Sequence, residues 1–316
     1  MQTSLEAIAK KAKRQKVYRF GNLYRLVNEE LLMDSWTKLN KHAAMGVDKI
    51  SVQEYGQNLA GNIRQLVEKL KKGSYHAKLV KRHYIPKRDG KMRPLGIPAV
   101  EDKLLQYAVL QILQAIFEGD LLPSTFGYRP GRGAKEAVNE LVGALWSKPY
   151  QYVVEADIKG FFDNINHEWM VRMLEQRIQD RAFIRLIKKW LKAGVLEPDG
   201  KVIHPVTGTP QGGIISPMLA NIYMHFCLNL WFERKVKKHC KGLAYLCVYA
   251  DDFVAAFERK EEAEAFYRVL GKRLAKFSLS LSPEKTRIVR FSRNRMEENG
   301  TFEFLGFEYR FRGHNT

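Results

Sequence analysis

The chain has 316 residues, and its 53 Lys and Arg residues against 34 Asp and Glu residues give a formal net charge of +19. With 45% hydrophobic residues it can bury a large core, which excludes a disordered or collagen-like chain and favours one large or two interlocked domains. The longest apolar run, 243–250, is far shorter than the roughly 20 residues of a membrane helix. We therefore expect no membrane partner, and the lack of an N-terminal secretory pattern favours a cytoplasmic protein.

The excess of positive charge is concentrated in residues 1–100, which contain 21 basic and 8 acidic residues, a net charge of +13. One cluster, interleaved with Tyr18 and Phe20, consists of Lys10, Lys11, Lys13, Arg14, Lys16 and Arg19. A second cluster places ten bases and one acid in residues 69–93. Cations that neutralise phosphates beside aromatic rings that stack on bases are typical of RNA-binding proteins, whereas a solvated helix face is the alternative.

Apolar residues with a helical period predict helices over 101–117 and 134–147. The short β-branched and aromatic segment 151–158 predicts a strand with Val153, Glu155 and Asp157 on one face. Two helices over 167–178 and 181–193 follow, and then a hairpin that turns at Asp199-Gly200. The predicted strand 151–158 therefore carries Asp157 at its C-terminal end.

A long helix is predicted to begin at Ser216-Pro217. The apolar strands 243–249 and 253–257 are separated only by Ala250-Asp251-Asp252 and should form a tight hairpin with carboxylates at its tip. A helix over 261–277 and strands over 286–291 and 302–311 complete the pattern. With 167–204 treated as an insertion, the order is βαββαβ, which predicts an α+β fold with a ferredoxin-like antiparallel sheet and helices on one face.

This topology would bring Asp157 beside Asp251 and Asp252 at one edge of the sheet. Three unpaired carboxylates repel one another and raise each other's pKa, so the arrangement favours bound cations. Hard cations with oxygen ligands fit best, and we expect two Mg²⁺ ions suited to in-line phosphoryl transfer. A solvated Asp-Asp turn is the alternative for the pair taken alone.

Several motifs, in order along 46–309, resemble those of reverse transcriptases, and the most similar type is the group II intron-encoded reverse transcriptase and maturase. The resemblance is carried by the following segments: Gly46-Val47-Asp48, Arg93-Pro94-Leu95-Gly96-Ile97-Pro98, Gly127-Tyr128-Arg129-Pro130-Gly131-Arg132-Gly133, Asp157-Ile158-Lys159-Gly160-Phe161-Phe162, Thr209-Pro210-Gln211-Gly212-Gly213, Ser216-Pro217-Met218-Leu219-Ala220-Asn221 and Tyr249-Ala250-Asp251-Asp252. The resemblance implies a right-hand polymerase with fingers and palm.

The resemblance also implies roles for individual residues. It makes Asp157, Asp251 and Asp252 the catalytic metal ligands, with the Ile158 carbonyl as a further ligand. It makes Phe162 the aromatic gate that excludes a 2′-hydroxyl, although ordinary core packing is the alternative because Phe161 is equally aromatic. The remaining residues implied to bind the incoming deoxyribonucleotide are Lys87, Arg93, Gly160, Phe161 and Gln211. Lys285 matches a position proposed to protonate pyrophosphate.

The expected domains are an N-terminal extension with fingers over 1–98, palm over 99–164, a fingers insertion over 165–208 and palm over 209–316. After Phe304-Leu305-Gly306-Phe307, which resembles the closing hairpin of the palm, the chain ends at Thr316. Intron-encoded relatives continue into a thumb or maturase domain, so we expect that this domain is absent here. A truncated form of a longer protein is favoured over a naturally short relative. Its activity alone therefore stays open.

The function implied is RNA-directed DNA synthesis from deoxyribonucleotides, on an RNA template with a DNA primer, together with binding of group II intron RNA to aid splicing and mobility. One alternative is an RNA-binding splicing scaffold in which catalysis is secondary. Another is a CRISPR-associated or other prokaryotic reverse transcriptase. The intact trio of acids favours a polymerase, and the resemblance also leaves a homodimer open.

Overall fold

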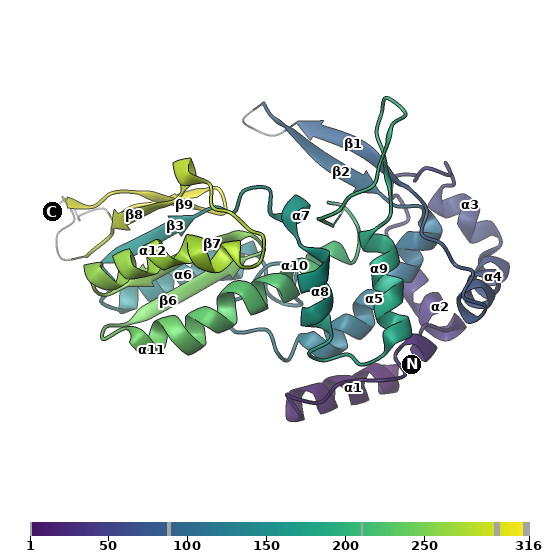
Figure 1. Ribbon diagram of the computed structural model, residues 1–316, viewed down its shortest axis with the longest axis horizontal. Helices are drawn as coiled ribbons and strands as arrows, with labels where there is room; N and C mark the ends of the chain where they lie inside the picture. Colours follow the sequence, from purple (N-terminus) through teal and green to yellow (C-terminus); the bar gives the residue numbers. More distant parts are fainter. Residues whose placement is uncertain (1, 87–89, 210, 294–297, 312–316) are drawn as a thin grey trace. The chain divides into compact units, whose positions relative to one another are not determined.

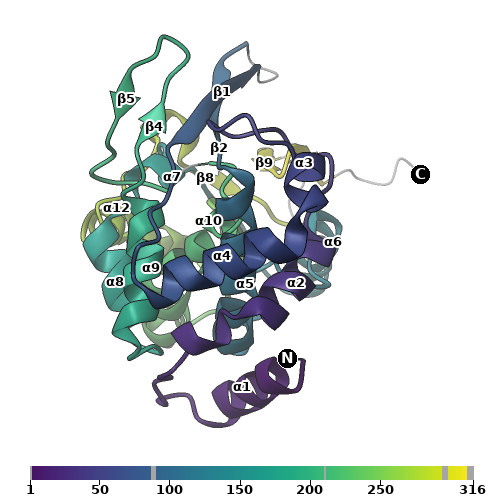
Figure 2. The same cartoon turned by 90° about the vertical axis from the view of Figure 1, so that its right-hand side faces the viewer.

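The computed structural model describes residues 2–86, 90–209, 211–293 and 298–311. The chain divides into two compact units, each formed by two separate segments. Unit 1 consists of residues 1–120 and 166–219, and unit 2 consists of residues 121–165 and 220–316. Each unit is described by itself below, and its elements can be followed in Figures 1 and 2.

Unit 1 combines a group of helices with one small sheet. Its helices are α1 (Gln2–Arg14), α2 (Glu29–Lys38), α3 (Val52–Gln57), α4 (Leu59–Lys71), α5 (Val100–Phe117), α8 (His167–Leu174) and α9 (Arg181–Leu191), with a 3₁₀ turn at Tyr24–Leu26. Its strands are β1 (Val80–Pro86), β2 (Met92–Ile97), β4 (Val195–Leu196) and β5 (Val202–Ile203), in the order β2-β1-β4-β5. The predicted hairpin that turns at Asp199-Gly200 is confirmed by the antiparallel pair β4–β5, and β1 and β2 form a second antiparallel pair.

Helix α5 is the central helix of unit 1, as its uninterrupted apolar pattern predicts. Leu104, Leu105, Ile112 and Leu113 are fully buried, and the helix contacts both α1 and α2. Asp102 is an exception in this apolar surrounding, because it is only 2% exposed.

Asp102 is stabilised by a small buried network. The Tyr75 hydroxyl donates to one carboxylate oxygen at 2.5 Å, and the Lys78 backbone N–H donates to the other at 3.0 Å. The Trp190 indole N–H in turn donates to the Tyr75 hydroxyl at 2.8 Å. Burial outweighs these hydrogen bonds and raises the pKa of Asp102 to about 6.

We expect this raised pKa to make folding stability depend on pH. Between the unfolded value of 3.8 and the folded value of about 6, the folded chain binds the additional proton, so lowering the pH through this window stabilises it. The free energy of unfolding of the wild type, relative to that of Asp102→Asn, should rise by roughly 2 kcal/mol between pH 7 and pH 4.5. Urea unfolding across this range measures the effect, and a flat difference would contradict the assignment.

Unit 2 is built on the predicted βαββαβ pattern. Its strands are β3 (Tyr152–Ala156), β6 (Ala244–Tyr249), β7 (Asp252–Phe257), β8 (Arg287–Arg290), β9 (Phe302–Phe304) and β10 (Phe307–Tyr309). Its helices are α6 (Ala134–Ser147), α7 (Phe161–Asn164), α11 (Lys237–His239) and α12 (Lys260–Ala275), with a 3₁₀ turn at Pro283–Lys285. Helix α10 (Ser216–Met224) enters the unit from unit 1 and continues through π-helical turns at His225–Asn229 and Phe232–Val236.

The sheet of unit 2 has the strand order β6-β7-β3-β8, and all of its pairs are antiparallel. This is the ferredoxin-like order, so the predicted fold class is confirmed. The two helical segments of the βαββαβ unit cover one face, where Phe232 and Phe266 pack on Phe257. The opposite face packs on α6 and the β9–β10 hairpin through a cluster that includes Leu141 and Val254. These elements belong to unit 2 but are not part of the βαββαβ pattern.

Three details differ from the sequence prediction. The long helix from Ser216 is not α-helical throughout, because two π-helical turns interrupt it. The segment 302–311, predicted from its pattern as one strand, forms the hairpin that the family resemblance implied, since Leu305 and Gly306 both take positive φ values and turn the chain. The third difference, at the acid-bearing hairpin, belongs to the candidate site.

The expected division into fingers and palm stays a prediction. Unit 1 contains α5, which the prediction placed with the palm, whereas unit 2 contains the whole ferredoxin-like sheet. Within the described residues, no helix is long and apolar enough to cross a membrane.

Candidate active site

The tip of the β6–β7 hairpin is a two-residue turn. Tyr249 pairs with Asp252, so only Ala250 and Asp251 lie outside the ladder, where a three-residue turn was predicted. Two-residue turns match the right-handed twist of antiparallel strands, but they need positive φ. Ala250 has φ of +57°, a conformation that costs an L-residue energy and that is held in place by the surrounding structure.

Asp157 lies beside this hairpin because β3 is the neighbour of β7. The last pair of the β3–β7 ladder is Ala156 with Phe253, so Asp157 follows one residue beyond it, on the level of Asp252. The Ser282 N–H donates to the Asp157 carbonyl at 2.9 Å, and the Lys159 N–H donates to the Ser280 carbonyl at 2.9 Å. Neither of these two hydrogen bonds uses the Ile158 carbonyl.

The electrostatics of the three acids reflect their common edge. Loss of hydration, followed by the charges of Asp251 and Asp157, raises the pKa of Asp252 to about 6. The side chain of Asp252 nevertheless stays open to solvent and so to an arriving cation. The Lys285 ammonium lies 3.9 Å from the Asp157 carboxylate, where it offsets part of the negative charge.

The donor set at this edge suits a hard divalent cation, since it consists of carboxylate oxygens and a backbone carbonyl. The described residues do not, however, present any cluster of three His, Cys, Asp or Glu side chains close enough to hold a metal ion. Mutual repulsion separates carboxylates that have no cation between them. The three acids are thus gathered at one edge without forming a closed cage.

A hollow of about 360 Å³ opens in unit 2 beside Asp157 and Asp252. Two residues without a predicted role line it as well: Glu155 and Arg287, whose carboxylate and guanidinium groups lie 2.9 Å apart. Glu155 also accepts the Glu303 N–H at 3.2 Å and so links β3 to β9. Because the sequence pattern places Glu155 and Asp157 on the same face of the strand, it could have indicated that Glu155 lies near the site.

The residues after Asp157 separate into buried and accessible ones. Gly160 has φ of +54° and precedes α7 in the left-handed conformation that glycine tolerates. Phe161 is 1% exposed and packs against Tyr223, so any effect of Phe161 on a nucleotide is indirect. Phe162 is only half-buried and lies edge-on to Phe161 at 5.4 Å. Of the two rings, Phe162 is therefore the one able to contact a sugar.

The other predicted nucleotide-binding residues belong to unit 1. Arg93 is exposed on β2, and Lys87 lies outside the described residues. The Gly96 N–H of β2 donates to the Gln211 carbonyl, and a Cβ on Gly212 would lie 2.7 Å from the Gly96 carbonyl. The hairpin with Arg93 and the loop with Gln211 are therefore in direct contact inside unit 1.

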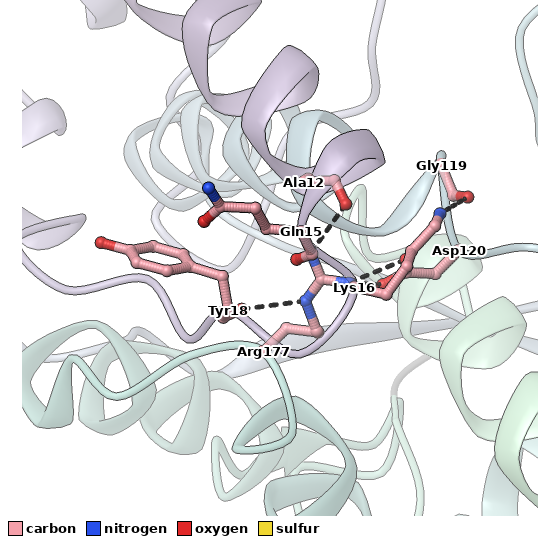
Figure 3. A network of polar contacts seen from close by, with 7 residues as sticks. All are labelled: Ala12, Gln15, Lys16, Tyr18, Gly119, Asp120 and Arg177. Carbon is pink, nitrogen blue, oxygen red and sulfur yellow. Dashed lines mark hydrogen bonds and ion pairs between the residues drawn. The ribbon is translucent and has the colours of Figure 1, made fainter.

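The basic residues of the N-terminal cluster do not all have the same freedom. Lys10, Lys13 and Arg14 are exposed on α1. The Lys11 ammonium instead lies 3.5 Å from the centre of the Tyr18 ring. Lys16 donates to the Gly119 carbonyl and to Asp120, and therefore anchors the chain after α1 (Figure 3).

A buried arginine, which sequence reasoning missed, completes this anchor. Arg177 is 3% exposed and holds Asp120 through two hydrogen bonds of 2.6 and 2.8 Å. It also donates to the carbonyls of Ala12, Gln15 and Tyr18 (Figure 3). The Arg177 guanidinium thus fixes the end of α1. A single Arg within an apolar sequence pattern does not predict such a role.

Comparison with known proteins gives consistent results. The family model "Reverse transcriptase (RNA-dependent DNA polymerase)" matches residues 85–309. The Group II intron-encoded protein LtrA of Lactococcus lactis subsp. cremoris is 42% identical over 180 residues, which are 55% of this chain and 29% of that protein. Protein YkfC of Escherichia coli (strain K12) is 31% identical over 291 residues, covering 83% of this chain and 74% of that protein.

Among solved structures, telomerase from Candida albicans in complex with a fragment of telomeric RNA matches with a TM-score of 0.57 and 14% identity. The match covers 76% of this chain and 46% of that chain, and it supports the right-hand polymerase fold. The chain therefore belongs to the reverse transcriptase family, whose members use divalent metal ions. Its similarity to LtrA, which is named as a group II intron-encoded protein, agrees with the resemblance that the motifs carry. It spans less than a third of the length of LtrA.

Proposed function

We propose that the chain is an RNA-directed DNA polymerase that adds deoxyribonucleotides to the 3′-hydroxyl of a DNA primer on an RNA template. The observation that carries the proposal is the convergence of Asp157, Asp251 and Asp252 at one edge of the unit 2 sheet, with the hairpin turn held at positive φ. A scaffold that only binds RNA would gain nothing from gathering carboxylates where phosphates must approach.

In this proposal the three carboxylates and the Ile158 carbonyl hold two Mg²⁺ ions. Bound there, the cations would activate the primer hydroxyl and neutralise the triphosphate. In the same proposal Lys285, whose ammonium lies 3.9 Å from the Asp157 carboxylate, gives a proton to the departing pyrophosphate.

The remaining residues bind and select the nucleotide. Arg93 and Lys87 hold the triphosphate as charge-assisted donors, and the loop at Gln211 lies against the nucleotide. Gly160 lets the chain turn so that Phe162, supported by Phe161, contacts the sugar. We assign fingers to 1–98 and 165–208 and palm to 99–164 and 209–316.

Single-nucleotide addition tests this function directly. The chain at saturating concentration, an RNA template annealed to a DNA primer, one complementary deoxyribonucleotide and Mg²⁺ should give a primer one nucleotide longer. A single addition does not require the chain to stay on the template, so weak processivity would not hide it. Template–primer that binds without being extended would exclude the polymerase function and favour the scaffold alternative.

We further propose that the basic cluster around α1 binds group II intron RNA, in the bacterial cytosol, and thereby supports splicing and mobility. LtrA, which is named as a group II intron-encoded protein, supports this partner. The exposed positions Lys10, Lys13 and Arg14 are available to phosphates, whereas Lys16 already serves the Arg177 anchor. A homodimer remains compatible with this function.

Replacing Lys10, Lys13 and Arg14 by Gln should weaken RNA binding and flatten its dependence on salt. Each lost phosphate contact lowers the slope of log K against log salt concentration by about 0.7 to 0.9, so three contacts lower it by roughly 2 to 3. Filter binding at KCl concentrations from about 50 to about 300 mM measures the slope. Replacement of Lys260, Lys272 and Lys276 by Gln, at three exposed positions outside both basic clusters, is the matched control. An unchanged slope in the Lys10, Lys13 and Arg14 variant would reassign the cluster to a solvated helix face.

A further inference from the structure

The segment Ser124–Gly127 runs beside β6 and reaches the turn that carries the acids. The Val248 N–H donates to the Ser124 carbonyl at 2.8 Å, and the Phe126 N–H donates to the Val248 carbonyl at 2.8 Å. The segment therefore extends the sheet at its β6 edge by one short parallel bridge. It belongs to none of the strands that the βαββαβ pattern predicts.

Gly127 brings this segment into contact with the strained turn. A Cβ at Gly127 would lie 2.7 Å from the Ala250 nitrogen and 3.2 Å from the Tyr249 carbonyl carbon, both of which are backbone atoms that cannot move aside independently. Only a glycine allows the two backbones to approach this closely. The position of the Ala250 turn is thus coupled to the position of Gly127.

Two buried asparagines from one helical segment hold Ser124–Gly127 in place. The Asn221 side-chain amide donates to the Gly127 carbonyl at 2.7 Å, and the Asn229 side-chain amide donates to the Thr125 hydroxyl at 2.6 Å. Both asparagines are 0% exposed. Within the described part of the chain, the Oδ1 atom of each has no hydrogen-bond partner. Burying an unpaired oxygen lowers folding stability, so a contribution to stability does not explain why these two positions are asparagines.

The π-helical turn at His225–Asn229 explains how both asparagines reach the same segment. At 3.6 residues per turn, side chains eight residues apart in an α-helix point about 80° apart. A π-helical turn contains one additional residue, which rotates Asn229 back toward the face of Asn221. The irregular helix thereby presents two amide donors to one short stretch of backbone.

We propose that Asn221 and Asn229 are positioning residues for the acid edge. By holding Ser124–Gly127 against β6, they keep Gly127 under the Ala250 backbone and preserve the positive-φ turn from which Asp251 and Asp252 project. This role rests on the proposed polymerase function, but its structural part is testable without catalysis.

The sharpest test uses Thr125, because it is buried and its hydroxyl is the partner of Asn229. Thr125→Val keeps the shape and removes the acceptor, whereas Thr125→Ser keeps the hydroxyl. We expect Thr125→Val and Asn221→Ala to lower kcat for single-nucleotide addition by about tenfold or more, with KM for the nucleotide within about threefold, and Thr125→Ser to restore kcat.

Two readouts do not depend on activity. The same two variants should bind Mn²⁺ more weakly by about fivefold or more, measured from the electron paramagnetic resonance signal of the free ion. Their amides in 244–257 should exchange hydrogen faster than in the wild type, while exchange in α5 (100–117) of unit 1 is unchanged. Gly127→Ala should behave as Asn221→Ala does. Gly143→Ala is the matched control, since a Cβ at Gly143 would have nothing within 4 Å.

A folded Thr125→Val variant with wild-type Mn²⁺ affinity and wild-type exchange in 244–257 would overturn the proposal, whatever the behaviour of Asn221→Ala. If the wild type itself adds no nucleotide, the polymerase function fails, but the Mn²⁺ and exchange measurements still decide the positioning role. If all variants lose kcat and Mn²⁺ affinity only in proportion to their loss of folded protein, the asparagines are structural and the proposal is wrong.

Discussion

Replacing Asp251 by Asn should reduce single-nucleotide addition by at least about a thousandfold while leaving template–primer affinity within a few-fold. Asn has nearly the same shape but carries no charge, so the variant removes one cation ligand and little else. It also removes one of the charges that raise the pKa of Asp252, which should return toward its ordinary value. Rapid-quench measurement of primer extension gives the rate, and gel shift gives the affinity.

The control for this variant is Asp199→Asn, which makes the same chemical change in the exposed turn between β4 and β5. That variant should keep the wild-type rate. Primer extension by Asp251→Asn at more than about a tenth of the wild-type rate would remove Asp251 from the cation ligands and with it the central element of the proposed function.

Replacing Phe162 by Val should admit ribonucleotides. The half-buried ring of Phe162 is the accessible member of the Phe161–Phe162 pair, and a smaller side chain leaves room for a 2′-hydroxyl. The ratio of kcat/KM for a deoxyribonucleotide over the matching ribonucleotide should fall by about a hundredfold, mainly through faster ribonucleotide incorporation. Competing single-nucleotide additions on one template measure the ratio.

Phe162→Tyr retains the ring and should retain the selectivity of the wild type, so it separates the size of the side chain from damage to α7. A Phe162→Val variant that is active and equally selective would place the gate elsewhere. Phe161→Leu offers a further contrast, because Phe161 is buried and its replacement should lower stability more than selectivity.

Patterns along single elements predicted the sheet of unit 2 well. Alternation placed Asp157 at a strand end, and the close spacing of two apolar strands placed Asp251 and Asp252 at a hairpin tip. The βαββαβ order then fixed which strands are neighbours, because a chain of this order has few compact arrangements. For these reasons the common edge of the three acids could be predicted without a structure.

Features that depend on tertiary contacts could not be predicted. The identity of Ala250 does not indicate positive φ, because alanine favours negative φ. Contacts with neighbouring residues hold Ala250 in the positive-φ conformation. The π-helical turns leave no clear mark on the apolar pattern of the long helix. Likewise, the number of charges near α1 predicts a basic surface, but it cannot reveal that Lys16 is used to anchor the chain.

The division of unit 2 into two segments has a consequence for synthesis on the ribosome. β3 lies between β7 and β8 in the sheet, yet it is made about 100 residues before β7 and about 130 residues before β8. Until they emerge, both hydrogen-bonding edges and the apolar residues Val153 and Val154 lack their final partners. Unit 2 therefore acquires its sheet late, and until then its central strand β3 is exposed to incorrect pairing.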